Sequence, residues 1–247
     1  MIRPFVVLYV TASVDGRITL EPDKTMFDMD ERYKVLGSPE EWVRFEQKIE
    51  DIYHPQFWME GSHMVVRQGE PLRELPSFQG PPGELYDDYL PAEVVEDPKR
   101  ESWLGIVDGL GRFRNGYKGE PSRPLLHLTS YQAPPEYLYF LRQNKTPYMV
   151  SGPGPVDLMT MLQKIRVRLG VTCVATSSGG RLSGALMRLG LIDEINIRMN
   201  PVIIGGFKTP SLFDSPELKP GEWPVSLEKI GVEAEGDVLV LRYRVRH

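Results

Sequence analysis

The residues with the clearest chemical potential lie within 171–207, where a strand-like run leads into small residues and then leucines. Residues 171–176 are rich in β-branched side chains, which suit a buried strand. Ser-Ser-Gly-Gly at 177–180 then breaks the run. A strand that delivers small residues to a helix start makes an anion site, because free backbone N–H groups and the helix dipole both point there. The pattern favours a nucleotide-phosphate cradle, and an ordinary strand-to-helix turn would give the same pattern.

A second candidate is Asp15, which follows the apolar strand expected at 5–10. Asp15-Gly16 is a turn signal, and ligands gather at strand ends in α/β sheets. A plain hairpin aspartate would also explain it. Ser62, after the strand expected at 57–59, is placed to cap a brief helix. Two such helix starts, at Ser62 and at Gly179, would suit the two ends of a dinucleotide.

Composition argues against several other classes of site. The chain has 247 residues and a net charge of −5, without a basic cluster, which argues against a nucleic-acid surface. The histidines, at positions 54, 63, 127 and 247, show no metal-ligand spacing. The single cysteine, Cys173, lies among apolar residues and indicates a buried thiol in a cytosolic protein. No apolar run is long enough to cross a membrane, and no signal-peptide pattern is expected.

Strand, turn and helix alternate through the middle of the chain, which predicts a largely parallel sheet covered by helices. Ser38-Pro39 begins one helix, with Glu41 completing a capping box. Other helices are expected at 134–144, 158–169 and 180–189, and hairpin strands at 225–234 and 238–245. The expected fold class is α/β, with a mostly parallel central sheet, flanking helices and a C-terminal antiparallel hairpin.

The least regular stretch is 68–102, which contains six prolines and an acidic bias. A structureless loop of this size within a compact domain is uncommon and is usually a lid, a binding loop or a disordered insertion. Because strand-like segments continue on both sides, we interpret residues 1–247 as a single domain that carries this insertion.

Four segments together resemble a known family. They are 11–18 (TASVDGRI), 57–65, 107–112 (VDGLGR) and 174–206, and they occur in the family's order. The last is the most specific, with these residues in register: Leu182, Leu186, Leu191, Asp193, Glu194, Pro201, Gly205 and Gly206. The chain is similar to the dihydrofolate-reductase-like fold, and more closely to the reductase (C-terminal) domain of the riboflavin biosynthesis protein RibD.

The resemblance implies NADPH as the hydride donor. Ala12 would touch the nicotinamide end through its backbone, and Ser62 would cap the helix that faces the pyrophosphate. Thr129 and Ser130 would grip the adenosine 2′-phosphate with hydroxyls and backbone donors. The residues that would form the helix-start cradle are Gly179, Gly180, Arg181 and Leu182.

The resemblance also implies a small-molecule substrate, a phosphoribosylamino-aminouracil whose opened sugar is reduced. Asp15 would lie beside substrate and nicotinamide, and it is our candidate for the catalytic proton transfer. Arg73 would bind the substrate phosphate, with Arg67 nearly as suitable. Ser177 stands where the family has a substrate-binding glutamate, so a different carbonyl, imine or pterin-like substrate, or an NADPH-binding homologue without activity, remains open.

A homodimer is expected from the family and from the apolar run 195–204, if that run is exposed. A fully buried central strand would explain the same run.

Overall fold

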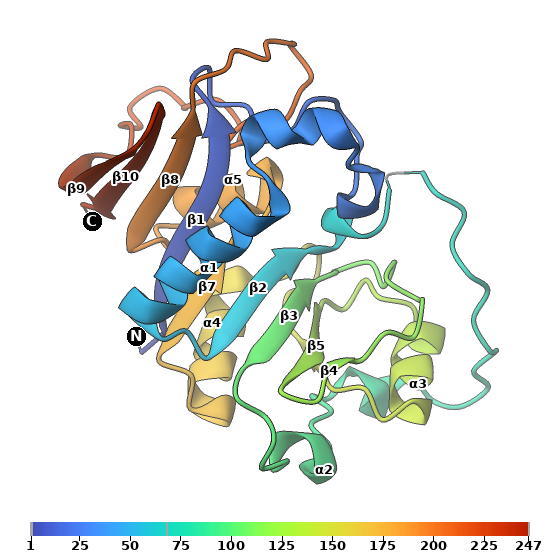
Figure 1. Cartoon of the computed structure of the whole chain (residues 1–247). Helices are drawn as coiled ribbons and strands as arrows, with labels where there is room; N and C mark the ends of the chain where they lie inside the picture. The colour runs from blue at the N-terminus through green and yellow to red at the C-terminus, as the bar shows by residue number, and fades with distance from the viewer. Residues whose placement is uncertain (1, 68, 247) are drawn as a thin grey trace. The chain divides into compact units, whose positions relative to one another are not determined.

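The computed structural model describes residues 2–67 and 69–246 and divides into two compact units. We call Met1–Pro4 with Gln56–Thr172 the middle unit, and Phe5–Pro55 with Cys173–His247 the terminal unit. Each contains a layer of mostly parallel strands with helices packed on it (Figure 1). The terminal unit therefore joins two segments that are far apart in the sequence.

The sheet of the terminal unit has the strand order β7-β1-β8-β10-β9. β1 (Phe5–Ser13) lies between β7 (Cys173–Thr176) and β8 (Glu194–Asn200), and both run parallel to it. β10 (Val238–Val245) pairs antiparallel with β8 and with β9 (Leu227–Glu235). The expected parallel sheet with a C-terminal antiparallel hairpin is confirmed.

α1 (Pro39–Tyr53) begins where the sequence predicts. Ser38 Oγ accepts the Glu41 N–H at 3.3 Å, and Glu41 Oε2 accepts the Ser38 N–H at 2.7 Å. This reciprocal capping box satisfies two helix-start donors, and such a cap is worth about 1 kcal/mol. Phe45 and Ile49 are buried, and Phe45 packs edge-on against Tyr9 of β1.

β8 corrects the expectation of an exposed apolar strand. Residues 194–200 form an inner strand between β1 and β10, and all are buried except the half-buried Met199. The alternating residues Glu194, Asn196, Arg198 and Asn200 place polar groups on one face. Arg198 donates to Asn200 Oδ1 at 2.7 Å and to the Glu41 carboxylate of α1, so this buried charge is paired.

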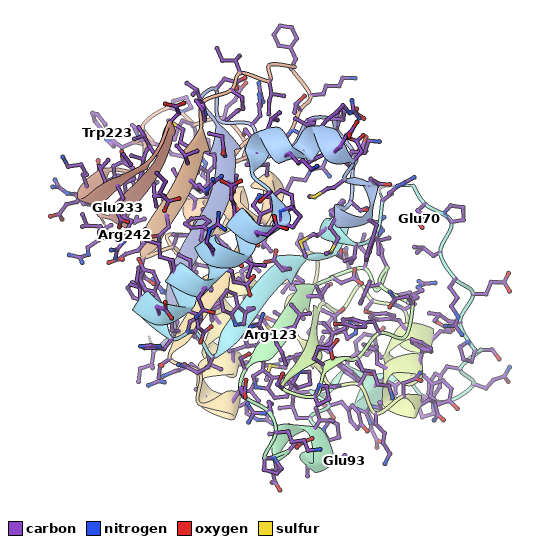
Figure 2. The ribbon with its side chains drawn as sticks, viewed as in Figure 1. Glu70, Glu93, Arg123, Trp223, Glu233 and Arg242 are labelled. Atoms are coloured by element: carbon purple, nitrogen blue, oxygen red, sulfur yellow. The ribbon has the colours of Figure 1, made fainter. Side chains whose placement is uncertain are left out.

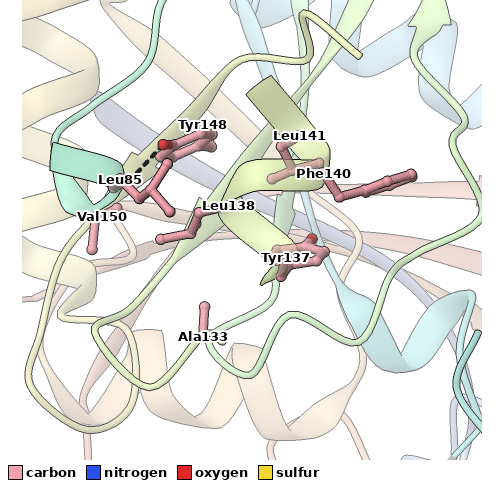
Figure 3. Packing of buried hydrophobic residues seen from close by; sticks show 8 residues of the cluster. All are labelled: Leu85, Ala133, Tyr137, Leu138, Phe140, Leu141, Tyr148 and Val150. Carbon is pink, nitrogen blue, oxygen red and sulfur yellow. Dashed lines mark hydrogen bonds between the residues drawn. The ribbon is translucent and has the colours of Figure 1, made fainter. Parts of the chain in front are cut away.

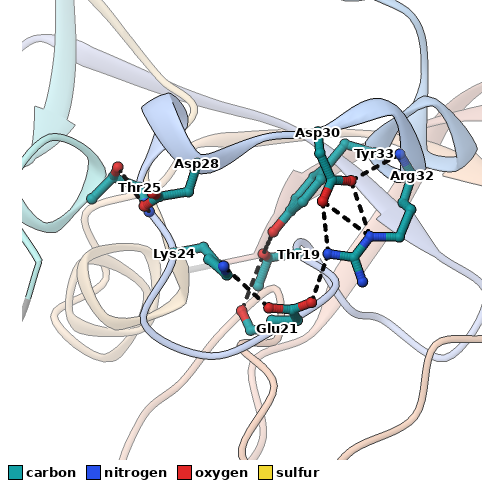
Figure 4. Close-up of polar contacts among 8 residues, drawn as sticks. All are labelled: Thr19, Glu21, Lys24, Thr25, Asp28, Asp30, Arg32 and Tyr33. Atoms are coloured by element: carbon teal, nitrogen blue, oxygen red, sulfur yellow. Dashed lines mark hydrogen bonds and ion pairs between the residues drawn. The ribbon is translucent and has the colours of Figure 1, made fainter.

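The segment between β1 and α1 is polar, and its own side chains order it. It contains two short helices, η1 (Met26–Asp28) and η2 (Glu31–Leu36). Thr25 and Asp28 hydrogen-bond to each other, and Arg32 pairs with Asp30 at 2.7 Å and with Glu21 at 2.8 Å (Figure 4). Because Arg32 is exposed, these ion pairs arrange the loop and contribute little to stability.

In the middle unit, β3 (Trp103–Val107) lies between β2 (Phe57–Gly61) and β5 (Arg123–Thr129), and the three strands run parallel. β6 (Tyr148–Val150) pairs parallel with β5, and the short β4 (Gly119–Glu120) pairs antiparallel with the start of β5. α3 (Pro135–Gln143) and α4 (Leu158–Leu169) occupy the predicted positions.

The second half of the predicted insertion is ordered. It contains η4 (Gly83–Tyr86) and α2 (Ala92–Val95), and Tyr89 forms an antiparallel bridge to Tyr148. Leu85 belongs to the core cluster that α3 builds with Tyr148 (Figure 3). Asp88 accepts Lys164 Nζ at 2.8 Å and the Val150 N–H at 3.0 Å. From residue 83 to the bridge at Tyr89 the insertion therefore packs as part of the middle unit, and 69–82 keep the irregular character expected.

Candidate functional site

The candidate residues gather at the carboxyl ends of parallel strands within each unit. In the terminal unit, Ala12 and Asp15 lie at the end of β1, and 177–182 follow its parallel neighbour β7. In the middle unit, Ser62 follows β2, and 129–130 end β5. Ligands bind at this edge in open α/β sheets, so the folding of each unit brings its own candidates together.

α5 (Gly180–Arg188) begins at the predicted glycines, with Gly179 in the capping position. Gly179 is exposed, and a Cβ built on it would have no atom within 4 Å. A Cβ on Gly180 would lie 2.2 Å from Ser211 O and 2.4 Å from Asp214 Oδ2. Gly180 therefore makes room for the chain's own loop, whereas Gly179 leaves open space at the helix start.

Asp214 places a carboxylate against the first turn of α5. Its Oδ1 accepts Ser211 N at 3.2 Å and Ser211 Oγ at 2.7 Å, and its N–H donates to Gly180 O at 2.9 Å. A carboxylate is stabilised at a helix N-terminus and repels a second anion there. Leu182 N donates to Gly179 O at 3.1 Å. The predicted cradle is thus reduced to the exposed Gly179 and Arg181, and Gly180 is not available to a ligand.

Two serines close the turn between β7 and α5. Ser178 is 1% exposed, its Oγ lies 3.1 Å from Ser183 Oγ, and Ser183 Oγ donates to Ser178 O at 2.9 Å. Ser177 is half-buried and keeps surface for a ligand.

Asp15 is held as an ionised carboxylate. It accepts hydrogen bonds from Ser13 Oγ at 2.6 Å, Gly205 N at 2.7 Å and Ile204 N at 3.1 Å. The Ser13 hydroxyl and these backbone N–H groups lower the pKa of Asp15 to about 2. Asp15 therefore carries no proton to give near neutral pH, and it ties the end of β1 to the loop after β8.

Ala12 is fully buried in β1, opposite Met199 of β8. Its carbonyl oxygen accepts Asn200 Nδ2 at 3.3 Å. The predicted backbone contact to a nicotinamide is not available at Ala12 in this structure, because the residue presents no surface. The exposed neighbour on the turn is Val14, which is 56% exposed.

Thr129 and Ser130, the predicted grip on a 2′-phosphate, are both 0% exposed in this structure. Thr129 Oγ1 donates to Asp108 O at 2.9 Å, and Ser130 Oγ donates to Gly109 O at 2.8 Å. Their hydroxyls attach the turn after β3 to the end of β5. The exposed residue beside them is Tyr131.

Ser62 is the first residue of η3 (Ser62–Met64), and Gly61 stands in the capping position. Ser62 O accepts the N–H groups of Val65 at 3.1 Å and Val66 at 2.9 Å. The expected cap at Ser62 is therefore wrong, and a single turn of this length provides little dipole for a pyrophosphate.

A buried polar chain lies under the turn after β3, and no motif in the sequence indicates it. Asp108 is 2% exposed, and its Oδ2 accepts Phe113 N at 2.7 Å and the Tyr137 hydroxyl at 3.3 Å. Tyr137 Oη lies 2.6 Å from His127 Nδ1. Burial raises the pKa of Asp108 and of Tyr137, and it lowers the pKa of His127 to about 3. His127 is therefore a neutral core residue.

Arginines surround the same turn on its outer side. Arg112 Nη1 lies 3.4 Å from His63 Nε2, and Arg114 Nε donates to Gly111 O at 2.7 Å. The predicted phosphate ligand Arg73 is exposed, with its guanidinium 5.7 Å from the centre of the Phe140 ring. Sequence reasoning identified the family stretch ending at Arg112 and missed the part played by Arg114.

Residues 2–67 and 69–246 contain no group of three His, Cys, Asp or Glu side chains arranged to hold a metal ion. Over the same ranges, no helix has the length and apolar character needed to span a membrane. Burial raises the pKa of the Cys173 thiol to about 12, as expected for an unreactive core thiol.

Residues 119–241 match the RibD C-terminal domain family. The chain is 26% identical over 242 residues to a 2,5-diamino-6-ribosylamino-4(3H)-pyrimidinone 5′-phosphate reductase of Archaeoglobus fulgidus, covering 98% of this chain and 99% of that protein. A protein of the same name from Methanothermobacter thermautotrophicus is 27% identical over 142 residues, covering 57% of this chain and 65% of the relative. The match to this second relative thus spans slightly under two thirds of its length.

Solved structures share the fold. RibD from Acinetobacter baumannii superposes with a TM-score of 0.63 at 17% identity, over 99% of this chain and 58% of that one. The Saccharomyces riboflavin biosynthesis reductase Rib7 gives a TM-score of 0.61 at 14% identity, over 100% of this chain and 91% of that one. A pyrimidine reductase-like protein from Corynebacterium diphtheriae gives 0.65 at 12% identity, over 99% and 92%. The resemblance in fold to these reductases is confirmed.

Proposed function

We propose, on the premise that residues 119–241 belong to the RibD C-terminal domain family, that this protein is an NADPH-dependent reductase of a phosphoribosylamino-pyrimidine. The observation that carries the proposal is the similarity to the Archaeoglobus fulgidus reductase, which extends over nearly the whole of both chains. The proposed substrate class is that of 5-amino-6-(5-phosphoribosylamino)uracil and its 2,5-diamino-pyrimidinone counterpart. We place the reaction in the cytosol.

The start of α5 offers room for a cofactor phosphate beside Gly179 and not beside Gly180. Gly179 leaves open space next to the helix N-terminus, and Arg181 adds an exposed positive charge. Asp214 opposes an anion at Gly180, so the chain holds the phosphate at Gly179 and keeps it away from the 211–215 loop. When bound, NADPH supplies the hydride that reduces the opened sugar.

We assign Asp15 a positioning role in place of proton donation. Its carboxylate fixes Ile204 and Gly205 at the carboxyl edge of the sheet, where the loop after β8 borders the candidate site. An ionised group can orient a substrate N–H or hydroxyl, and the proton that accompanies the hydride then comes from water or from another acid.

Arg73 is the proposed ligand of the substrate phosphate, with Arg67 as its alternative, because both are exposed on the same segment. Ser177 takes the position of the family's glutamate and offers a hydroxyl where the family offers a carboxylate. This difference favours a second candidate function, reduction of another carbonyl, imine or pterin-like compound. A protein that binds NADPH and turns over none of these would be a non-catalytic homologue.

We propose a homodimer built on β9 and β10 in place of the buried β8. Val232 and Leu239 lie on one face of this hairpin and are 50% and 39% exposed. Trp223, which precedes the hairpin, is 88% exposed (Figure 2). Val232→Lys should shift the molecular mass in solution to that of a monomer. A wild-type mass of one chain at micromolar concentration would contradict the dimer.

The experiment for the activity is a titration with NADPH and with NADH, followed by tryptophan quenching. Turnover of the phosphoribosylamino-pyrimidine is then followed by loss of the reduced-nicotinamide absorbance. The expected result is selective NADPH binding, weakened by Arg181→Glu, and oxidation of NADPH that requires the substrate. Absence of binding for both nucleotides would overturn the reductase proposal.

A further inference from the structure

The irregular part of the insertion contains a repeating pattern of burial. In residues 71–79, which we call the strap, Leu72, Leu75 and Phe78 are half-buried and the residues between them are exposed. A period of three with interspersed prolines is that of polyproline II, which has three residues per turn and no internal hydrogen bonds. Such a segment depends on side-chain anchors to stay in place.

The anchors of the strap rest on the core of the middle unit. Leu75 and Phe78 pack against the cluster built by α3, and the Phe78 ring lies 5.2 Å from the Tyr139 ring. Leu72 packs against a second cluster that contains Phe113. Each anchor is partly exposed, so the strap is held by a modest apolar area.

Two arginines from the turn after β3 donate hydrogen bonds to the backbone at the N-terminal end of the strap and just before it. Arg114 Nη1 donates to Arg73 O at 3.3 Å, and Arg112 Nη2 donates to Arg67 O. The guanidiniums therefore use part of their donor set on carbonyl oxygens in and just before the strap. The turn itself is fixed from below by the Asp108 carboxylate, which accepts the Phe113 N–H at 2.7 Å.

These contacts leave each guanidinium only part of its donor set for a phosphate. Arginine grips a phosphate with two parallel N–H groups, either Nε with Nη2 or Nη1 with Nη2. In Arg114, Nε is engaged by Gly111 O and Nη1 by Arg73 O, so each edge has lost one donor. In Arg112, Nη2 donates to Arg67 O, which uses one of the two N–H groups on that nitrogen.

We propose that the strap closes an anion site formed by Arg112 and Arg114, and that a phosphate group opens it by replacing the carbonyl oxygens of Arg67 and Arg73 on the two guanidiniums. A charged phosphate oxygen is a stronger acceptor than a backbone carbonyl, so the exchange is favourable once the phosphate arrives. The inference depends on the proposed function in one respect only, which is the identity of the phosphomonoester that binds in the cell.

The first test measures the strap directly, with inorganic phosphate as the probe and the full-length protein. Chymotrypsin cleavage after Phe78 should accelerate several-fold in phosphate compared with potassium chloride of equal ionic strength. Cleavage after Phe207, which is fully exposed in the terminal unit, is the internal reference and should not change. Cleavage after Phe78 that is slowed or unaffected by phosphate would overturn the proposal.

The second test uses the competition between strap and anion. Phe78→Ala removes an anchor, so the open form becomes more populated and the apparent affinity for phosphate rises by up to about tenfold. Phe207→Ala, at a fully exposed phenylalanine of the terminal unit, is the matched control and should leave the affinity unchanged. Equal or weaker phosphate binding by Phe78→Ala, or no binding by either protein in calorimetry, would contradict the exchange.

Arg114→Lys tests whether the hydrogen-bonding geometry of Arg114, and not only its positive charge, holds the strap. The ammonium keeps the positive charge and cannot engage Gly111 O and Arg73 O in the same fork. Strap cleavage should then be fast without phosphate and insensitive to it. Neither cleavage nor phosphate binding requires turnover, so a protein without reductase activity leaves this proposal standing, and a strap that does not respond leaves the reductase proposal standing.

Discussion

The start of α5 and the turn after β3 stand at the same kind of place, the carboxyl edge of a parallel sheet, and use opposite chemistry. α5 begins with glycines, and the chain fills part of the space they leave with Asp214. The turn at 108–114 begins with a buried carboxylate that accepts the Tyr137 hydroxyl, and its two arginines are half-buried and donate to backbone carbonyls. Glycine content marked the first region as a ligand site, yet the second presents more positive charge to a ligand.

The largest effect should come from filling the space at the α5 start. Gly180→Ala puts a Cβ within 2.4 Å of Asp214 Oδ2 and closer still to a backbone oxygen, so the loop must move. We expect a loss of about 2–3 kcal/mol in the free energy of unfolding, measured by urea titration. Gly179→Ala, with open space around it, should cost less than about 1 kcal/mol. Equal losses at both positions would remove the distinction between a packed and an open glycine.

The polar chain under the other turn should give the next largest effect. Tyr137→Phe removes the hydroxyl shared by Asp108 and His127 and leaves buried groups with fewer partners, at a cost of about 2–3 kcal/mol. Tyr86→Phe is the matched control from the same core cluster, because its hydroxyl donates to Ala133 O, and it should cost about 1 kcal/mol. Urea unfolding of the two variants side by side decides the point. If Tyr137→Phe costs no more than Tyr86→Phe, the chain does not stabilise the turn.

His127, under the turn after β3, and Asp15, at the end of β1, should lose their contributions to stability in different pH ranges. Burial lowers the pKa of His127 to about 3, so as pH falls below 6.5 the histidine is protonated in the unfolded chain before it is protonated in the folded one. The free energy of unfolding therefore declines as pH falls from 6.5 toward 3. Asp15 has a pKa lowered from 3.8 to about 2, so its contribution is complete above 3.8 and is lost as pH falls through 2. Unfolding free energies of His127→Gln and Asp15→Asn against wild type, as a function of pH, should change in these separate windows. A His127→Gln curve parallel to wild type from pH 6.5 to 4 would show that His127 is not buried as described.

The smallest effect concerns Ser130. If its hydroxyl attaches the turn to β5, Ser130→Ala costs about 1 kcal/mol of stability and leaves the preference for NADPH over NADH unchanged. Binding titrations with both nucleotides provide the check. A selective loss of NADPH affinity would restore the 2′-phosphate role predicted from the sequence.

The sequence was sufficient for the elements and their order, because hydrophobic periodicity and caps are local. Ser38 and Glu41 marked a helix start that the structure reproduces, and the strands at β1, β7 and β8 follow from their apolar runs. It was also sufficient for the resemblance to the RibD C-terminal domain family, which residues 119–241 match, since the residues around Gly205 and Gly206 lie in register with a long signature.

The direction in which a side chain points could not be predicted from local sequence patterns. Thr129 and Ser130 are hydroxyl residues at a strand end whether they face a ligand or a neighbouring turn, and burial decides between the two. Asp214, which shares the α5 start, is 34 residues beyond Gly180 in the chain and belongs to a loop without periodicity. Long-range partners of this kind carry no local signal, so the fold was more accessible to prediction than the site.

The composition of the terminal unit has a consequence for how the chain folds during synthesis. β1 is made first, but its partners β7 and β8 follow more than 150 residues later. The middle unit is almost one continuous segment and can complete its sheet as it leaves the ribosome. Until β7 has emerged, β1 is an apolar strand with two unpaired edges, and the edge that pairs with β8 stays open until residue 200, so β1 needs protection from aggregation during synthesis.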